Sequence, residues 1–141
     1  MLDVGLNLRF RRKIMLGCIL LYVGMVLMSN GLYGLGKIGD KSNVIMNFFT
    51  GGLGLILNII ALGYGACVGK PALWFYESAT GLLFAFTYLY VALNKIFNLD
   101  GRLYGWYSLF VAINSIPAGI LCFTNHYGGN DLYGIIWWLW G

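Results

Sequence analysis

The stretch FYESATGLLFAFTYLYVALN, residues 75–94, decides the fold, because it is apolar along its length yet carries polar groups at regular intervals. A helix of this length reaches about 30 Å, the thickness of the hydrocarbon core of a membrane. At about 100° per residue, one face of this helix carries Glu77, Thr80, Phe84, Tyr88 and Val91. Such a stripe of rings and hydroxyls either packs against neighbouring helices or lines a passage for a polar solute, and the spacing is compatible with both.

The composition of the whole chain excludes an ordinary soluble domain. Of its 141 residues, 60% are hydrophobic and 10% are charged, whereas soluble proteins carry about 25% charged residues. Three of the four arginines and one lysine crowd positions 9–13 and no basic patch recurs beside aromatic residues, so we expect no nucleic-acid binding. Three dispersed cysteines and one histidine form no metal-ligand pattern, and we expect no metal and no cofactor. The chain is predicted to be an all-α integral membrane protein in contact with membrane lipid.

Four apolar segments are long enough to cross a bilayer, and a fifth begins near the C-terminus. The expected spans are 15–36, 43–68, 72–97 and 103–123, and a polar turn at 124–130 precedes the last segment, 131–141. That last segment reaches only about half of the hydrocarbon thickness. We therefore expect a transmembrane helix bundle of four full spans and a partial fifth, in a chain that is incomplete at its C-terminus.

Helical periodicity predicts an inward face on the first and last segments too. In the first span one face carries Leu16, Leu20, Val23, Leu27 and Asn30, and the amide of Asn30 is expected to face another helix or water. In the last segment Tyr133, Trp137 and Trp140 share a face, whereas Trp138 points away.

The second span is interrupted by Gly51, Gly52 and Gly54. Small residues let helices approach closely in a membrane, so we expect a helix–helix contact there. Asn47 and Asn58 in the same span either form hydrogen bonds between helices or line a passage.

Residues 1–14 form a basic leader ahead of a second methionine, Met15. The first and third connections carry the most lysine and arginine, which places both in the cytoplasm and the start of the first span outside. A basic leader is disfavoured on that side. We therefore interpret residues 1–14 as a misassigned start and 15–141 as the transmembrane domain.

Five long blocks of the sequence are unusual enough to identify a family. They are MLGCILLYVGMVLMSNG (15–31), VIMNFFTGGL (44–53), FYESATGLLFAFTYLYVALN (75–94), LDGRLYGWYSLFVAINSIPAGIL (99–121) and DLYGIIWWLWG (131–141). In this order they resemble the AmiS/UreI family of bacterial inner-membrane urea and short-chain amide channels. The resemblance implies a six-helix protomer of which this chain lacks the last part, and a homo-hexamer in which each protomer has its own narrow pore.

The resemblance also implies which side chains line that pore. By matching motif positions, they are Leu16, Val23, Leu27, Phe84, Tyr88, Trp137 and Trp140. Tyr133 stands where the best-known urea channel of the family has tryptophan, so the outer constriction is expected to differ in shape.

The function implied is passive passage of urea across the bacterial inner membrane, with a functional link to a cytoplasmic urease or amidase. A slot of aromatic faces passes a planar neutral solute while it rejects ions. The alternatives are a short-chain amide transporter and a non-conducting truncated fragment. We do not expect an enzyme, because Glu77 is the single acidic residue within the spans 15–36, 43–68, 72–97 and 103–123 and has no nucleophile–base pair beside it.

Two further residues carry open alternatives. Glu77 either attracts solute at the pore mouth or is a carboxylate favoured near a helix N-terminus. His126 either is a solvated turn residue or senses protons. Because the expected outer loops are short, we do not expect strong gating by acid.

Overall fold

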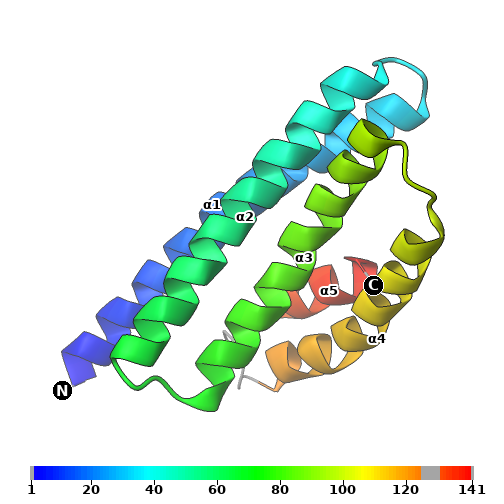
Figure 1. Cartoon of the computed structure of the whole chain (residues 1–141). Helices are drawn as coiled ribbons and strands as arrows, with labels where there is room; N and C mark the ends of the chain where they lie inside the picture. The colour runs from blue at the N-terminus through cyan, green and yellow to red at the C-terminus, as the bar shows by residue number, and fades with distance from the viewer. Residues whose placement is uncertain (1, 125–130, 141) are drawn as a thin grey trace.

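A computed structural model describes residues 2–124 and 131–140 of the chain. For residues 2–13, 15 and 16 it describes the backbone alone. This part of the chain forms five helices: α1 (Leu2–Gly34), α2 (Asp40–Cys67), α3 (Ala72–Phe97), α4 (Arg102–Phe123) and α5 (Asp131–Trp140). Three of them, α1, α2 and α3, lie alongside one another as long rods, and α5 lies between α3 and α4 (Figure 1). The predicted all-helical fold is confirmed.

Four of these helices are long and apolar enough to cross a membrane. The spans are Gly17–Gly34, Asp40–Cys67, Ala72–Phe97 and Arg102–Phe123, while α5 has 10 residues. The third span has the predicted bounds. In contrast, α2 begins at Asp40 and not at Asn43, because Gly39 is extended and an acidic side chain is favoured in a first helical turn. Helix α1 begins at Leu2, well before the expected start at Met15.

Helices α2 and α3 each end beside a residue with a left-handed backbone. Gly69, after α2, has φ +63°, which a residue without a side chain adopts without strain. The N–H of Lys70 donates to the carbonyl of Gly65 at 2.9 Å, and Pro71 is the N-cap of α3. Asn98 takes the left-handed conformation after α3, with φ 51°. The α1–α2 and α3–α4 connections lie at one end of the bundle (Figure 1), which we call the charged end (residues 35–41 and 95–102).

Close packing of α2 against α3 depends on glycine. A Cβ atom on Gly51 would lie 2.7 Å from Cγ of Leu89 and 2.8 Å from the carbonyl oxygen of Ala85, and one on Gly54 would lie 3.1 Å from Cβ of Ala85. At Gly52 a Cβ atom would meet nothing within 4 Å. The predicted helix contact is therefore confirmed at Gly51 and Gly54 but not at Gly52.

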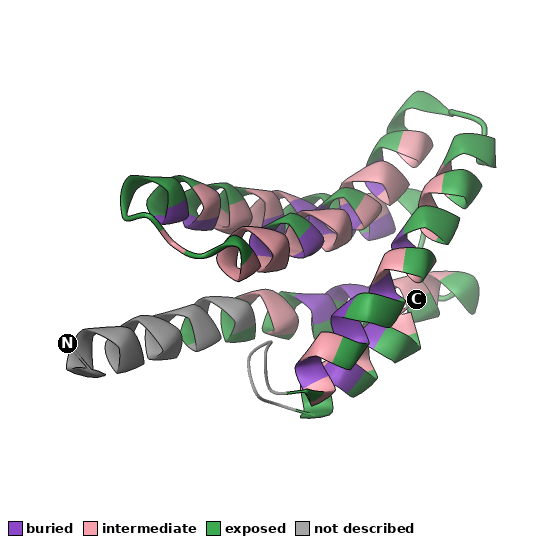
Figure 2. Ribbon diagram, turned by 90° about the horizontal axis from the view of Figure 1, so that it is seen from below, coloured by how far each residue is buried: buried purple, intermediate pink, exposed green. Residues whose placement is uncertain are grey.

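Buried residues occupy the faces that the helices turn toward one another, whereas the outside of the bundle is exposed (Figure 2). Many of the exposed side chains are large and apolar, such as Phe49 on α2 and Trp106 on α4. A helix surface of this kind suits contact with lipid or with another apolar protein surface.

Candidate functional site

Two aromatic pairs, one from α3 and one from α5, meet between these helices. Phe84 and Tyr88 lie one turn apart on α3, as Trp137 and Trp140 do on α5. The ring of Phe84 has its centroid 4.5 Å from that of Trp137 and 3.8 Å from that of Trp140. The ring of Tyr88 lies 6.0 Å from that of Trp140. We call these four residues the aromatic cluster.

The aromatic cluster joins helices whose backbones stay apart. Among the described residues, no Cα atom of α5 lies within 8 Å of a Cα atom of α3. Contact between α3 and α5 therefore depends on large side chains, whose rings offer flat apolar faces and polar edges. A flat solute can pass between α3 and α5 only where the ring faces of the aromatic cluster move apart from one another.

Helix α1 closes the third side of the cluster. Val23 and Val26 are 5% and 0% exposed and pack against Tyr88, which is 3% exposed. Leu27 is 49% exposed and is not among the residues that surround Tyr88. The face of α1 that packs on Tyr88 is thus centred on Val23 and Val26, and Leu27 lies beside this contact, so the pore-lining role of Leu27 stays a prediction.

The hydroxyl of Tyr88 is buried, and among the described residues no atom meets hydrogen-bond geometry with it. The indole N–H of the neighbouring Trp140 is a side-chain donor that acts on the phenol oxygen, so the O–H donor of Tyr88 is the part of the group left for a solute. A phenol can both donate and accept a hydrogen bond. An unpaired hydroxyl in an apolar site has free hydrogen-bonding capacity for a polar solute.

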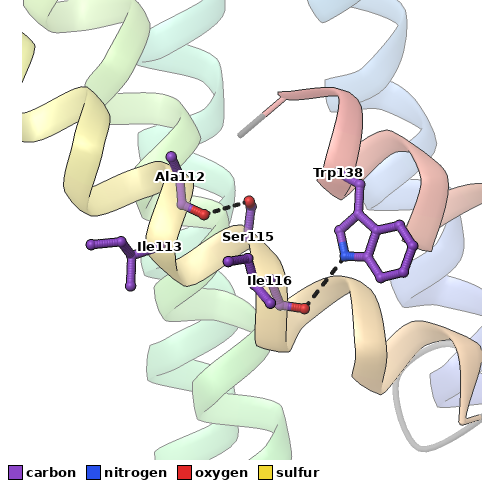
Figure 3. Close-up of a pocket in the computed structure, with 5 residues that line it drawn as sticks. All are labelled: Ala112, Ile113, Ser115, Ile116 and Trp138. Carbon is purple, nitrogen blue, oxygen red and sulfur yellow. Dashed lines mark hydrogen bonds between the residues drawn. The ribbon is translucent and has the colours of Figure 1, made fainter.

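The inward face of α5 is as the periodicity predicts. Trp137 is 7% exposed and is buried with Ala118 and Cys122 of α4, and Tyr133 packs against the same group. Trp138 is 53% exposed and lies on the other side of α5. Its indole N–H reaches the carbonyl oxygen of Ile116 at 3.5 Å (Figure 3).

A groove of about 380 Å³ lies on that other side of α5. It is lined by Ala112, Ile113, Ser115, Ile116 and Trp138 (Figure 3). Its walls are mostly apolar, and no residue of the aromatic cluster contributes to them. The groove is therefore separate from the candidate site.

Three predicted site residues lie apart from the cluster or cannot be placed. The side chain of Leu16 and the whole of His126 lie outside the described residues. Glu77 is half-buried near the start of α3, and the hydroxyl of Thr80 donates to its backbone carbonyl at 2.9 Å. The alternatives for Glu77 and His126 therefore stay predictions.

In the described residues no group of three or more His, Cys, Asp and Glu side chains could hold a metal ion. Cys18, Cys67 and Cys122 are free thiols, and only Cys122 is buried. The arrangement at the site is one of rings and aliphatic side chains around a hydroxyl, which suits passage of a neutral solute.

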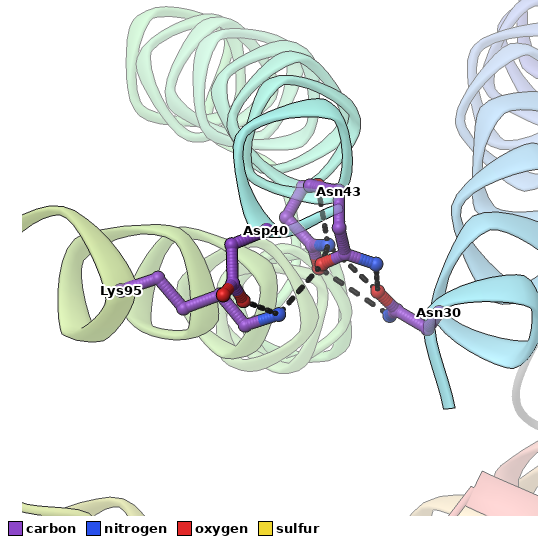
Figure 4. Close-up of polar contacts among 5 residues, drawn as sticks. Asn30, Asp40, Asn43 and Lys95 are labelled. Atoms are coloured by element: carbon purple, nitrogen blue, oxygen red, sulfur yellow. Dashed lines mark hydrogen bonds and ion pairs between the residues drawn. The ribbon is translucent and has the colours of Figure 1, made fainter. Parts of the chain in front are cut away.

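Sequence reasoning anticipated only part of a polar group near the charged end, because it did not single out Asn43 or Lys95. Asn30 of α1 accepts hydrogen bonds from the side-chain amides of Asn43 and Asn47 of α2 at 2.8 and 2.7 Å. We call these three residues the amide cluster, and Lys95 of α3 with Asp40 extends it (Figure 4). The prediction that Asn30 faces another helix is confirmed, and Asn47 is one of its partners. Asn58 instead donates to the carbonyl of Gly54 in its own helix.

Comparison with known proteins agrees with this arrangement. A family model described as AmiS/UreI family transporter matches residues 15–141. An acid-activated urea channel of Helicobacter pylori is 48% identical, over 90% of this chain and 77% of the relative. A putative amidate substrates transporter protein of Mycolicibacterium smegmatis is 42% identical, over 86% of this chain and 54% of the relative.

A solved structure has the same fold. The crystal structure of the urea channel from the human gastric pathogen Helicobacter pylori superimposes with a TM-score of 0.79 at 50% sequence identity. The match covers 89% of this chain and 74% of that chain. The chain therefore belongs to the AmiS/UreI family of membrane transporters.

Proposed function

We propose that this chain forms the wall of a passive channel for urea. The observation that carries the proposal is the aromatic cluster, in which α3 and α5 touch through the rings of Phe84, Tyr88, Trp137 and Trp140 while α1 closes the side with Val23. Likeness to the urea channel of Helicobacter pylori supports urea as the solute. In this proposal Tyr133 lines the same passage further along α5, and Leu16 and Leu27 line it on α1.

Selectivity follows from the chemistry of the walls. Urea is planar and neutral, so it can slide between ring faces after it gives up part of its water. A dehydrated ion would find no compensating charge among these rings, and its transfer would cost far more free energy. The Tyr88 hydroxyl replaces one of the hydrogen bonds that urea loses, because that hydroxyl is free of described protein partners.

The second candidate solute is a short-chain amide. Such amides share the planar polar head of urea, and the amidate transporter relative favours them. Under either proposal the protein is not an enzyme and lies in the bacterial inner membrane. It assembles as a ring of six and supplies a cytoplasmic urease or amidase with its substrate.

Stopped-flow light scattering on proteoliposomes tests the proposal. Vesicles that contain the protein should take up urea several-fold faster than empty vesicles. Phe84→Ala and Trp140→Ala each remove one of the two rings in closest contact, so both should lower the permeability of urea relative to glycerol several-fold, because the slot then admits thicker solutes. Uptake no faster than in empty vesicles, for urea and acetamide alike, would contradict a channel.

Trp138→Ala is the matched control. It removes the same ring from the same helix, but from the exposed side of α5. Its urea-to-glycerol ratio should equal that of the unaltered protein. An equal change in Trp138→Ala and Trp140→Ala would show that loss of any tryptophan from α5 disturbs the helix, and the aromatic cluster would lose its assigned role.

A further inference from the structure

Lys95 lies on the same face of α3 as the aromatic cluster. It follows Tyr88 by seven residues, which is two helical turns and about 10 Å along the axis. Its side chain is 21% exposed and reaches into the charged end of the bundle. The face that carries Phe84 and Tyr88 therefore continues to a positive charge.

The ammonium group of Lys95 contacts two other helices. It lies 3.3 Å from the carboxylate of Asp40 and donates to the side-chain oxygen of Asn43 at 3.3 Å, both on α2 (Figure 4). It also lies over the ring of Tyr33 on α1, 3.2 Å from the ring centroid. A cation over an aromatic face is attracted by the ring quadrupole, so one side chain joins α1, α2 and α3.

Asn43 connects Lys95 to the amide cluster. Its amide nitrogen donates to Asn30 at 2.8 Å, and its side-chain oxygen accepts from Asn47 at 2.9 Å. Asn43 and Asn47 are both 0% exposed. Moving α1 away from α2 at this level would leave buried amides unpaired, which is costly. The charged end therefore resists separation of the helices.

The separation of α1 from α3 is set by side chains and not by backbone packing. In the described part of the chain no Cα atom of α1 lies within 8 Å of one of α3. One link is the packing of Val23 and Val26 on Tyr88, and another is Lys95 over the ring of Tyr33. The first link lies at the aromatic cluster, and the second fixes the end of α1 beyond it.

We propose that Lys95 is a positioning residue that holds α1 against α3 and so sets the largest solute that passes the aromatic cluster. This inference rests on the proposed channel function and adds to it the group that determines size selectivity. Without the ammonium group, α1 stays joined to α2 by the amide cluster but can pivot about that contact relative to α3, and the Val23–Tyr88 contact loosens. The amide cluster keeps α1 on α2, so the chain still folds.

The test compares Lys95→Met with Lys95→Arg and Lys41→Met. Met keeps the unbranched shape but removes the charge, and it leaves no buried unpaired charge because Asp40 is 66% exposed. Lys41 is exposed beside Asp40, so Lys41→Met removes the same charge from the same end of the protein. The measurement is the permeability ratio of urea to propionamide in proteoliposomes.

Lys95→Met should lower this ratio several-fold, while Lys95→Arg and Lys41→Met keep it. The proposal would be overturned if Lys95→Met changed the permeabilities of urea and propionamide by the same factor. It would also be overturned if Lys41→Met lowered the permeability ratio as much as Lys95→Met. If Lys95→Met fails to fold, Tyr33→Leu removes the α1 side of the contact and should give the same fall in the ratio.

A distance measurement separates this proposal from the channel function, because it needs no flux. Spin labels on Leu35→Cys and Phe97→Cys, exposed positions beside α1 and at the end of α3, report the spacing of the two helices. Cys18→Ser and Cys67→Ser remove the exposed native thiols. The distance distribution should broaden with Lys95→Met and stay narrow with Lys41→Met. An unchanged distribution would refute the positioning role even in a protein that conducts urea.

Discussion

The Tyr88 hydroxyl is buried without a described hydrogen-bond partner, so its removal should affect solute passage more than folding. A net hydrogen bond contributes about 1 kcal/mol. If the hydroxyl bonds the solute, Tyr88→Phe should lower urea permeability roughly fivefold. The free energy of unfolding should stay level or rise, because a buried unpaired hydroxyl costs free energy. Stopped-flow uptake and thermal unfolding in detergent measure the two effects.

Tyr107 provides the matched control for Tyr88. Its hydroxyl donates to the carbonyl of Leu83 at 2.7 Å and joins α4 to α3. Tyr107→Phe should therefore lower stability by about 1 kcal/mol and leave urea permeability unchanged. The opposite pattern, a stability loss for Tyr88→Phe and a flux loss for Tyr107→Phe, would show that the solute bonds a different hydroxyl.

Helices α2 and α3 approach each other closely at Gly51. A single methyl group added there should push the two helices apart. Gly51→Ala would place its Cβ atom 2.8 Å from the carbonyl oxygen of Ala85, which cannot yield without backbone movement. We expect a loss of about 1–3 kcal/mol in the free energy of unfolding. Gly52→Ala, where open space surrounds the added atom, should cost nothing or stabilise the helix. Equal melting temperatures for the two variants would refute the close contact.

The outer surface of the described helices is exposed (Figure 2), and large apolar side chains such as Phe49 and Trp106 are among the exposed residues. Lipid can cover such a surface, and so can neighbouring protomers. We propose six copies in a ring, and light scattering on the detergent-solubilised protein should give a protein mass six times 15.7 kDa. A mass of one chain would favour lipid contact over the whole outer surface.

The sequence determined the class of protein and the approximate course of the apolar helices, but not the starts of α1 and α2. Low charge and long apolar segments require a membrane, and glycine, proline and charged residues mark where each helix ends. The sequence also paired Phe84 with Tyr88 and Trp137 with Trp140, because residues one turn apart share a face whatever lies opposite. Resemblance to the AmiS/UreI family is the reason that we propose one passage between these faces.

Tertiary structure alone decided which face of each helix meets its neighbours. Periodicity gives angles between side chains of one helix, but the direction of the inward face depends on what the other helices present. Tyr88 and the amide cluster turn Val26 of α1 inward and leave Leu27 half-exposed. For the same reason no local pattern indicates that Lys95 meets Tyr33, since Lys95 follows Tyr33 by 62 positions in the chain and only the parallel course of α1 and α3 brings the ammonium group over the ring.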